Sequence, residues 1–470
     1  MADNQALSAS RFPNESQSKK NEKRRTENMP NTTATTHPLT LARLQTFLSR
    51  TYKSKFVRNV AVVASGTAGA QAITTAFSPI ITRLYGPEAF GLLGTFMAIV
   101  AVVTPIAALS YPIAIVLPKE DSDARAIAKL SALLAGSIAL ILVLTLWLAG
   151  DWLADLLRVQ EIRSFLWLIP LVVVCSAFMQ IVQQWLIRKK QFRVTARAAV
   201  LNALVINVLK SGFGLLRPIA AVLIGLTAVG NGIHAGLLAF GAKKYEREYQ
   251  SERTGERRPI SLWAVAKQHY DFPLYRAPQV FINALSQSLP VLMLAAFFGP
   301  ASAGFYALCR RLLGLPSQLI GKSVGDVFYP RITEAAHNGE NLTCLLVKAT
   351  LALAAVGIFP FGIVVAFGPL LFGFVFGAEW VVAGEYARWL ALWMYLAFIN
   401  RPSVVSIPVM NLQGQFLKYE LVSVILRLSA LAIGFFVFQV DIFAIIIFSM
   451  MGVLLNVYLI FMTICKSKSQ

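Results

Sequence analysis

Charged residues are scarce in this chain, and that scarcity limits what the protein can be. Asp, Glu, Lys and Arg make up 14% of its 470 residues, and hydrophobic residues make up 56%. Soluble domains carry about 25% charged residues, and a globule cannot bury such an apolar excess because most of its residues lie near its surface. Two uncharged runs, 130–149 and 442–464, match the roughly 20 apolar residues that a membrane-spanning helix needs. We therefore predict an all-α integral membrane protein.

The chain also lacks the usual equipment of catalysis. Its four cysteines and four histidines lie far apart in the sequence, so neither a metal site nor a disulfide framework is expected. It has no Walker-type glycine-rich loop, which argues against ATP hydrolysis. The longest predicted outer segment, 151–165, is short for a membrane transferase or polymerase. We therefore expect a protein that is not an enzyme, with no catalytic residue, metal or cofactor.

The net charge of +20 does not indicate a nucleic-acid partner, because the cations lie in the N-terminal region, the loops and the apolar segments. If the N-terminus is cytoplasmic, the predicted inner loops and the C-terminal end hold 20 Lys and Arg, and the outer ones hold 5. Cytoplasmic loops of membrane proteins carry such an excess of Lys and Arg. We therefore place both termini in the cytoplasm.

Apolar segments of sufficient length predict twelve spanning helices. They cover residues 59–82, 90–116, 129–149, 165–187, 196–215, 218–241, 272–297, 303–326, 346–368, 383–411, 417–438 and 442–464. The domain boundaries follow from these segments and from the polar stretches between them. We expect a disordered basic cytoplasmic tail (1–57), an N-terminal six-helix half (58–241), a cytoplasmic linker (242–271) and a C-terminal six-helix half (272–470).

Two short stretches indicate that the halves are duplicates. "RLYGPEAFG", 83–91, and "AFFGPASAG", 296–304, lie 213 residues apart and share Gly-Pro followed by Gly. Proline cannot continue the preceding helix, and glycine lets the chain reverse tightly. Polar side chains in the preceding helices also correspond, with Gln71 falling on Asn283. Because each half has an even number of spans, the repeat would be parallel, with both halves entering the membrane in the same direction.

Several cations fall far from the ends of apolar helices, where a charge costs at least about 2.5–3.5 kcal/mol. They are Lys210, Arg276, Arg310, Arg311, Lys322, Arg401 and Arg427. Glu420 precedes Arg427 by seven residues on the same helix face, so a structural role for Arg427 is plausible. Arg276 could instead reach the membrane surface. Arg310 and Arg311 point about 100° apart, so we expect one of them to face a cavity.

The remaining cations have few carboxylates near them in the sequence, which favours an anionic cargo. Arginine offers paired donors to a phosphate, and lysine offers a mobile point charge. The neutral side chains Gln71, Gln279 and Asn283 follow the same stripes. Such side chains either bond helices together or line a water-filled cavity, and the sequence leaves both readings open.

The segment 271–331 resembles the Wzx-type polysaccharide and O-antigen flippases of the MOP (MATE-like) exporter superfamily. The matching pieces are "FPLY" (272–275), "NALSQSLPVLML" (283–294), "FFGPASAGFYAL" (297–308) and "VFYPR" (327–331), with "LYGPEAFGLL" (84–93) in the first half. The resemblance implies a V-shaped bundle of two six-helix halves around a cationic cavity. Arg311 stands where relatives often carry a basic residue, whereas Arg276 and Lys322 depart from the family pattern.

The resemblance implies a flippase in the bacterial inner membrane. Relatives move undecaprenyl-pyrophosphate-linked oligosaccharide units to the periplasmic leaflet by alternating access, for O-antigen, capsule or exopolysaccharide assembly. Arg311, Arg276, Lys322 and Lys210, with Arg310 and Arg401, are the candidates for the pyrophosphate, and Gln279, Asn283 and Gln71 for the sugar. Membrane lipids, a polymerase and a co-polymerase are the expected partners. A MATE-type cation-coupled drug antiporter and a membrane polymerase or transferase remain the alternatives.

Overall fold

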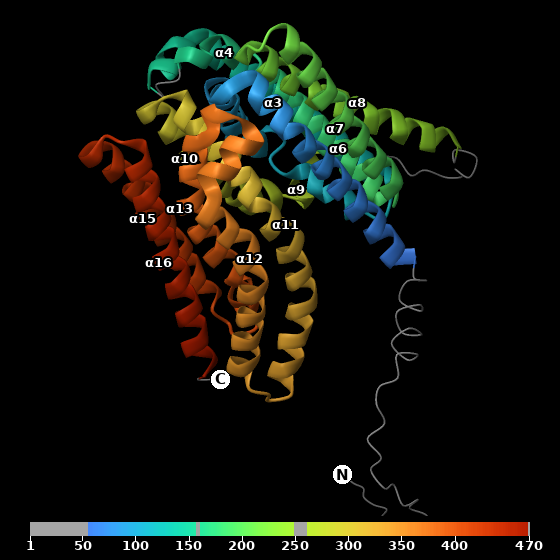
Figure 1. The fold of residues 1–470 in the computed structure, drawn as a ribbon. Coiled ribbons are helices and arrows are strands. Elements are labelled where there is room, and N and C mark those ends of the chain that lie inside the picture. Colours follow the sequence, from blue (N-terminus) through green and yellow to red (C-terminus); the bar gives the residue numbers. More distant parts are fainter. Residues whose placement is uncertain (1–54, 157–159, 249–260, 469–470) are drawn as a thin grey trace, which may run out of the picture. The chain divides into compact units, whose positions relative to one another are not determined.

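The computed structural model describes residues 55–156, 160–248 and 261–468, and every regular element within these ranges is a helix (Figure 1). The chain divides into two compact units, Met1–Arg58 and Asn59–Gln470. The predicted tail, 1–57, lies outside the described residues as far as residue 54, and a helix begins at Lys55. The all-helical class predicted from the sequence is therefore confirmed for the described part of the chain.

The first group of helices covers the predicted N-terminal half. It comprises α3 (Lys55–Ala107), η1 (Tyr111–Val116), α4 (Asp121–Leu156), η2 (Gln160–Ile162), α5 (Arg163–Leu166), α6 (Ile169–Arg188), α7 (Phe192–Leu216) and α8 (Ala220–Glu248). Helix α6 packs against α4 and α8, and α7 packs against α8. The buried cluster that includes Val172 and Val173 of α6, Ala135 of α4 and Ile224 of α8 forms the apolar core of this group.

The second group covers the predicted C-terminal half. It comprises η4 (Phe272–Arg276), α10 (Ala277–Phe298), α11 (Pro300–His337), α12 (Leu342–Phe376), η5 (Ala378–Trp380), α13 (Val381–Ile399), α14 (Arg401–Ser406), α15 (Gln413–Ile433), η6 (Gly434–Phe438) and α16 (Asp441–Ser467). Helix α13 packs against α11, α12 and α16, and α15 lies beside α16 (Figure 1). Fully buried Tyr386, Leu390 and Phe398 of α13 anchor the core of this group.

A short helix, α9 (Leu262–Gln268), lies within the predicted linker and packs on the first group. Its Val265 is 1% exposed and belongs to the same buried cluster as Ile115 and Ile127. The Tyr111 hydroxyl donates a hydrogen bond to the Ala266 carbonyl at 3.3 Å. The chain is therefore tied to the first group just before it enters the second.

Nine helices of the described residues are long and apolar enough to cross a membrane. One of them is α3, although Gly86 (φ 67°, ψ 173°) breaks its helical path at the first predicted Gly-Pro turn. Helices α11 and α13 fall outside the nine because charged side chains such as Arg310 and Arg388 lower their hydropathy. The count of twelve spans and the pseudo-repeat therefore remain predictions.

Large apolar side chains cover much of the surface of these helices. Phe374 is 80% exposed, Leu148 75% and Phe240 73%. Soluble monomers rarely expose apolar patches larger than a few hundred Å². Lipid is the solvent that accommodates such a surface, which agrees with the membrane class.

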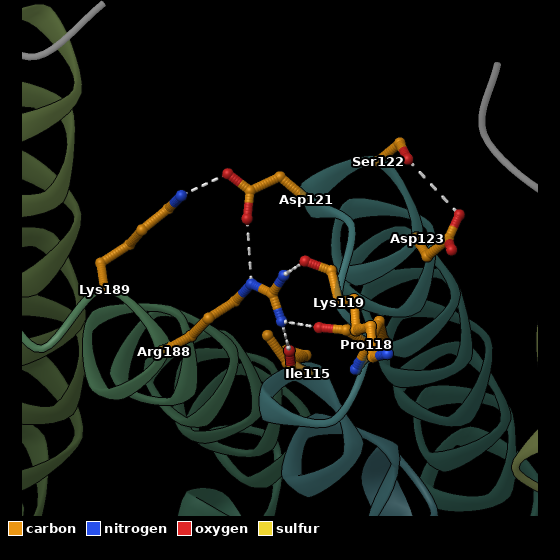
Figure 2. A network of polar contacts seen from close by, with 8 residues as sticks. All are labelled: Ile115, Pro118, Lys119, Asp121, Ser122, Asp123, Arg188 and Lys189. Carbon is orange, nitrogen blue, oxygen red and sulfur yellow. Dashed lines mark hydrogen bonds and ion pairs between the residues drawn. The ribbon is translucent and has the colours of Figure 1, made fainter. Parts of the chain in front are cut away.

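Arg188, near the C-terminal end of α6, clamps the loop between η1 and α4 (Figure 2). Its Nε donates to the Asp121 carboxylate at 3.0 Å, and its Nη atoms donate to the carbonyls of Ile115 (3.2 Å) and Lys119 (3.0 Å). A further bond reaches the Pro118 carbonyl, and Lys189 pairs with the same carboxylate. The Arg188 side chain is only 10% exposed, so this charge is compensated almost entirely by protein atoms.

We expect Arg188→Ala to lower the free energy of unfolding by about 1–3 kcal/mol, because the Asp121 carboxylate and three carbonyls lose a charged donor. The measurement is thermal unfolding of the purified protein in detergent. Arg331→Ala is the control, since Arg331 pairs with Glu340 at 43% exposure on each side and lowers the pKa of that carboxyl. Exposed pairs contribute less than about 1 kcal/mol. Equal losses for the two variants would contradict the clamp.

Candidate functional site

The predicted site residues come from both groups of helices. Gln71 lies on α3, Lys210 on α7, Arg276 at the end of η4, Gln279 and Asn283 on α10, Arg310, Arg311 and Lys322 on α11, and Arg401 at the start of α14. The side chain of Lys322 lies outside the described residues, so its role stays a prediction. The side chains of the other eight lie among the described residues.

Lys210 of α7 and Arg311 of α11 are two cations, one from each group of helices, that lie near enough for their charges to interact. Neither side chain forms an ion pair or a side-chain hydrogen bond with any described residue. Arg311 is exposed, so its guanidinium is accessible.

Arg310 points elsewhere and is held within the second group. One Nη donates to the Gln287 carbonyl at 2.8 Å and to the Tyr306 hydroxyl at 3.3 Å. The other Nη donates to Gln287 Oε1 at 3.0 Å. Which of the two adjacent arginines faces a cavity stays a prediction: Arg310 is engaged by these contacts, whereas Arg311 has no side-chain hydrogen bond with a described residue.

A polar stripe runs along η4 and the first turns of α10. The Arg276 guanidinium donates to Gln279 Oε1 at 2.9 Å, and Gln287 Nε2 donates to Asn283 Oδ1. Arg276, Gln279, Asn283 and Gln287 are all exposed, and they span about 16 Å at 1.5 Å per residue. The stripe begins on a π-helical turn, Phe272–Arg276, and such turns are frequent at functional sites because they shift the phase of the side chains that follow.

Gln287 is a site residue that the sequence analysis did not select. It connects Arg310 of α11 to Asn283 of α10, and so it joins a candidate cation to a candidate neutral contact. Its spacing of four residues from Asn283 places the two on one helix face, and that spacing could have identified it. The hydrogen bond to Arg310 could not have been predicted, because it joins two helices.

The sequence suggested a structural role for Arg427 because Glu420 lies on the same helix face, and the described contacts give Arg427 other partners. Its Nε donates to the Ser423 carbonyl at 3.1 Å, and its guanidinium lies 5.5 Å from the centre of the Trp393 ring. No Arg427–Glu420 ion pair occurs among the described residues. A guanidinium on an aromatic face gains about 0.5–2 kcal/mol, so packing on Trp393 supports Arg427 inside the second group.

Gln71 and Arg401 take no part in the contacts between candidate site residues described above. Gln71 is half-buried on α3 and Arg401 is exposed at the start of α14, and neither side chain forms a hydrogen bond with a described residue. Helix α3 nevertheless lies directly on α7, because a Cβ added at Gly66 would lie 2.3 Å from the Cβ of Ala196. Gln71 is therefore on a helix that contacts the one carrying Lys210.

The chemistry available at this site is the binding of negative charge. Lys210 and Arg311 offer unused donors, and Arg276 and Arg310 keep their charge while bonding to neutral amides. Within the described ranges no group of three or more His, Cys, Asp or Glu side chains could hold a metal ion. The arrangement thus has donors without an acidic counterpart, and an anionic ligand would satisfy them.

Comparison with known proteins agrees with the resemblance found in the sequence. The family described as "Polysaccharide biosynthesis protein" matches residues 80–385. The succinoglycan biosynthesis transport protein ExoT of Rhizobium meliloti (strain 1021) is 23% identical over 340 residues, which cover 70% of this chain and 63% of ExoT. The chain thus spans less than two thirds of the length of this curated relative.

Solved structures show the fold. An inward-facing multidrug resistance MATE family transporter of the MOP superfamily superposes with a TM-score of 0.67 at 14% identity, covering 85% of this chain and 95% of that one. The lipid II flippase MurJ, in an inward closed conformation, gives 0.62 at 13% identity, covering 86% and 87%. The chain therefore belongs to the polysaccharide biosynthesis protein family and has a MOP-type fold, as its likeness to Wzx-type flippases predicted.

Proposed function

We propose that this protein is a flippase that moves undecaprenyl-pyrophosphate-linked oligosaccharide units from the cytoplasmic to the periplasmic leaflet of a bacterial inner membrane. The glycan would serve a surface polysaccharide such as O-antigen, capsule or exopolysaccharide. Family membership and the name of the succinoglycan transport relative support a polysaccharide cargo. The likeness to a lipid II flippase supports a fold able to accommodate a lipid-linked head group.

The observation that carries the proposal is the pair of neighbouring cations Lys210 and Arg311. The two cations come from different halves of the chain and have no acidic partner among the described residues. A charge deep in a membrane needs an anion or water. A pyrophosphate has several anionic oxygens, so it can accept bonds from a guanidinium and an ammonium together. Without cargo the two cations repel each other, and with cargo bound the pyrophosphate bridges them.

The polar stripe supports a role for the sugar part of the cargo. Gln279, Asn283 and Gln287 offer amide donors and acceptors on the exposed face of α10, and hydroxyl groups of a sugar can use both kinds. Arg276 stands at the start of this stripe and Arg310 contacts its far end. In this proposal the pyrophosphate lies near Arg311 and Lys210, and the sugars extend along α10.

Alternating access is the proposed mode of transport. Buried cores centred on α6 and on α13 support two halves that can move as separate bodies, with α6 and α13 in equivalent places of the two predicted six-helix halves. The cation excess in the predicted inner loops supports cytoplasmic termini. The lipid tail would stay in the bilayer while the charged head passes between the halves.

In cells that lack this protein, we expect lipid-linked repeat units to accumulate in the inner leaflet and surface polysaccharide to be lost. Complementation with Arg311→Ala should restore export about ten- to one-hundred-fold less well than wild type, because a charge-assisted hydrogen bond contributes about 1.5–3 kcal/mol. Arg311→Lys should restore an intermediate level, since the charge remains and the paired donors are lost. The measurement is the leaflet distribution of extracted lipid-linked glycan.

Arg331→Ala on the same helix is the matched control and should export normally, because Arg331 already has an acidic partner. The unfolding temperature of Arg311→Ala should equal that of wild type, since this guanidinium has no hydrogen bond to lose. Wild-type export by Arg311→Ala would refute its role. Single units reaching the outer face while polymer is lost would indicate a polymerase, and drug sensitivity with normal glycan would indicate an antiporter.

A further inference from the structure

The two Gly-Pro turns touch each other through their backbones. A Cβ added at Gly91 would lie 1.6 Å from the carbonyl oxygen of Pro300, and a Cβ added at Gly304 would lie 2.2 Å from that of Pro87. Neither contact involves a flexible side chain that could move aside. Helices α3 and α11 can therefore approach this closely only because both positions are glycine.

The contacts are reciprocal. Each joins the proline of one turn to the glycine four residues further along the other, so exchanging the halves turns one contact into its counterpart. The turns themselves match, since Gly86 has φ 67° and ψ 173° and Gly299 has φ 90° and ψ 173°. Three residues past the glycines, a Cβ at Gly94 would lie 3.4 Å from the Cβ of Ala307. We call this contact (Pro87, Gly91 and Gly94 with Pro300, Gly304 and Ala307) the glycine seam.

Side chains close the seam along one edge. The Trp380 indole N–H donates to the Thr82 carbonyl at 3.1 Å, and Trp380 is 1% exposed. Arg83 donates to the Phe374 carbonyl at 2.5 Å. The Phe90 ring packs edge-on against Trp380 at 5.3 Å. These contacts also join α3 to the second group of helices, so separating the halves at this end would break all of them together.

Each of the two groups of helices connects the seam to a residue of the candidate site. In the first group, the Tyr85 hydroxyl donates to the carbonyl of Lys210 at 2.9 Å. In the second group, Gly304 and Arg311 lie on the same helix, seven residues or about 10 Å apart. A movement at the seam would therefore be transmitted to Lys210 through Tyr85 and to Arg311 along helix α11.

We propose that the glycine seam closes one end of the cavity and parts in each transport cycle, with Gly91 and Gly304 as positioning residues that permit closure. The proposal rests on the proposed transport function and adds the place where the halves separate. Opening would exchange the backbone contacts for water while the cavity closes around the cargo at its other end. A side chain at either glycine would exclude the closed state.

We expect Gly91→Ala and Gly304→Ala to raise the labelling rate of Gly94→Cys by a hydrophilic maleimide at least about five-fold, since overpacking shifts the population towards the open seam. The labelled protein is purified and carries serine in place of its four native cysteines. Gly136→Ala and Gly225→Ala are the controls, because a Cβ there meets nothing within 4 Å. Unchanged labelling in folded Gly91→Ala and Gly304→Ala protein would overturn the role of the glycines.

In the same background, Gly94→Cys with Ala307→Cys should form a disulfide, because the 3.4 Å separation is close to the 3.5–4.5 Å that a disulfide spans. The crosslink should abolish export, and a reductant should restore it to the level of the single variants. If the crosslinked protein exports as well as the single variants, the seam does not need to part during transport. If the two cysteines do not form a disulfide, the close contact at the seam is refuted. Labelling requires no cargo, so it tests the seam even if the glycan assignment fails.

Discussion

Positive charge held at membrane depth without an acidic partner is the constraint on which the rest of this account depends. A cation in hydrocarbon must be compensated, and the structure compensates several of its arginines with protein groups. Arg310 meets Gln287 and Tyr306, and Arg427 packs on Trp393. Lys210 and Arg311 receive none of these partners from the described residues. This difference supports the proposal that Lys210 and Arg311 bind a ligand.

The glycine seam and the neighbouring cations act in opposite directions on the two halves. At the seam, backbone contacts and the Trp380 hydrogen bond hold α3 against the second group. At the cations, the like charges of Lys210 and Arg311 repel each other. A bound anion would replace that repulsion with a bridge, and the halves would then have a reason to close at the cavity and to part at the seam.

The sequence predicted the parts of this protein that depend on composition and local spacing. Uncharged runs predicted the membrane helices, and the Gly-Pro pairs predicted both turns, whose glycines adopt positive φ. The sequence could not predict contacts between distant helices, such as Gly91 with Pro300 or Arg310 with Gln287. Spacing on one helix suggested a structural role for Arg427, but its packing on Trp393 of another helix could not be predicted. Arg310 and Arg311 differ in the contacts that they make with neighbouring helices, so the sequence alone could not distinguish them.

The affinity of the purified protein for inorganic pyrophosphate, measured by isothermal titration at several salt concentrations, tests directly whether Lys210 and Arg311 bind an anionic head group. We predict that wild type binds pyrophosphate and that the affinity falls as the salt concentration rises. Replacing both Lys210 and Arg311 by Gln should weaken binding about one-hundred-fold or more, since two charge-assisted hydrogen bonds of about 1.5–3 kcal/mol each are lost. Equal affinity in the double variant would contradict the claim that this pair of cations holds the anionic head of the cargo.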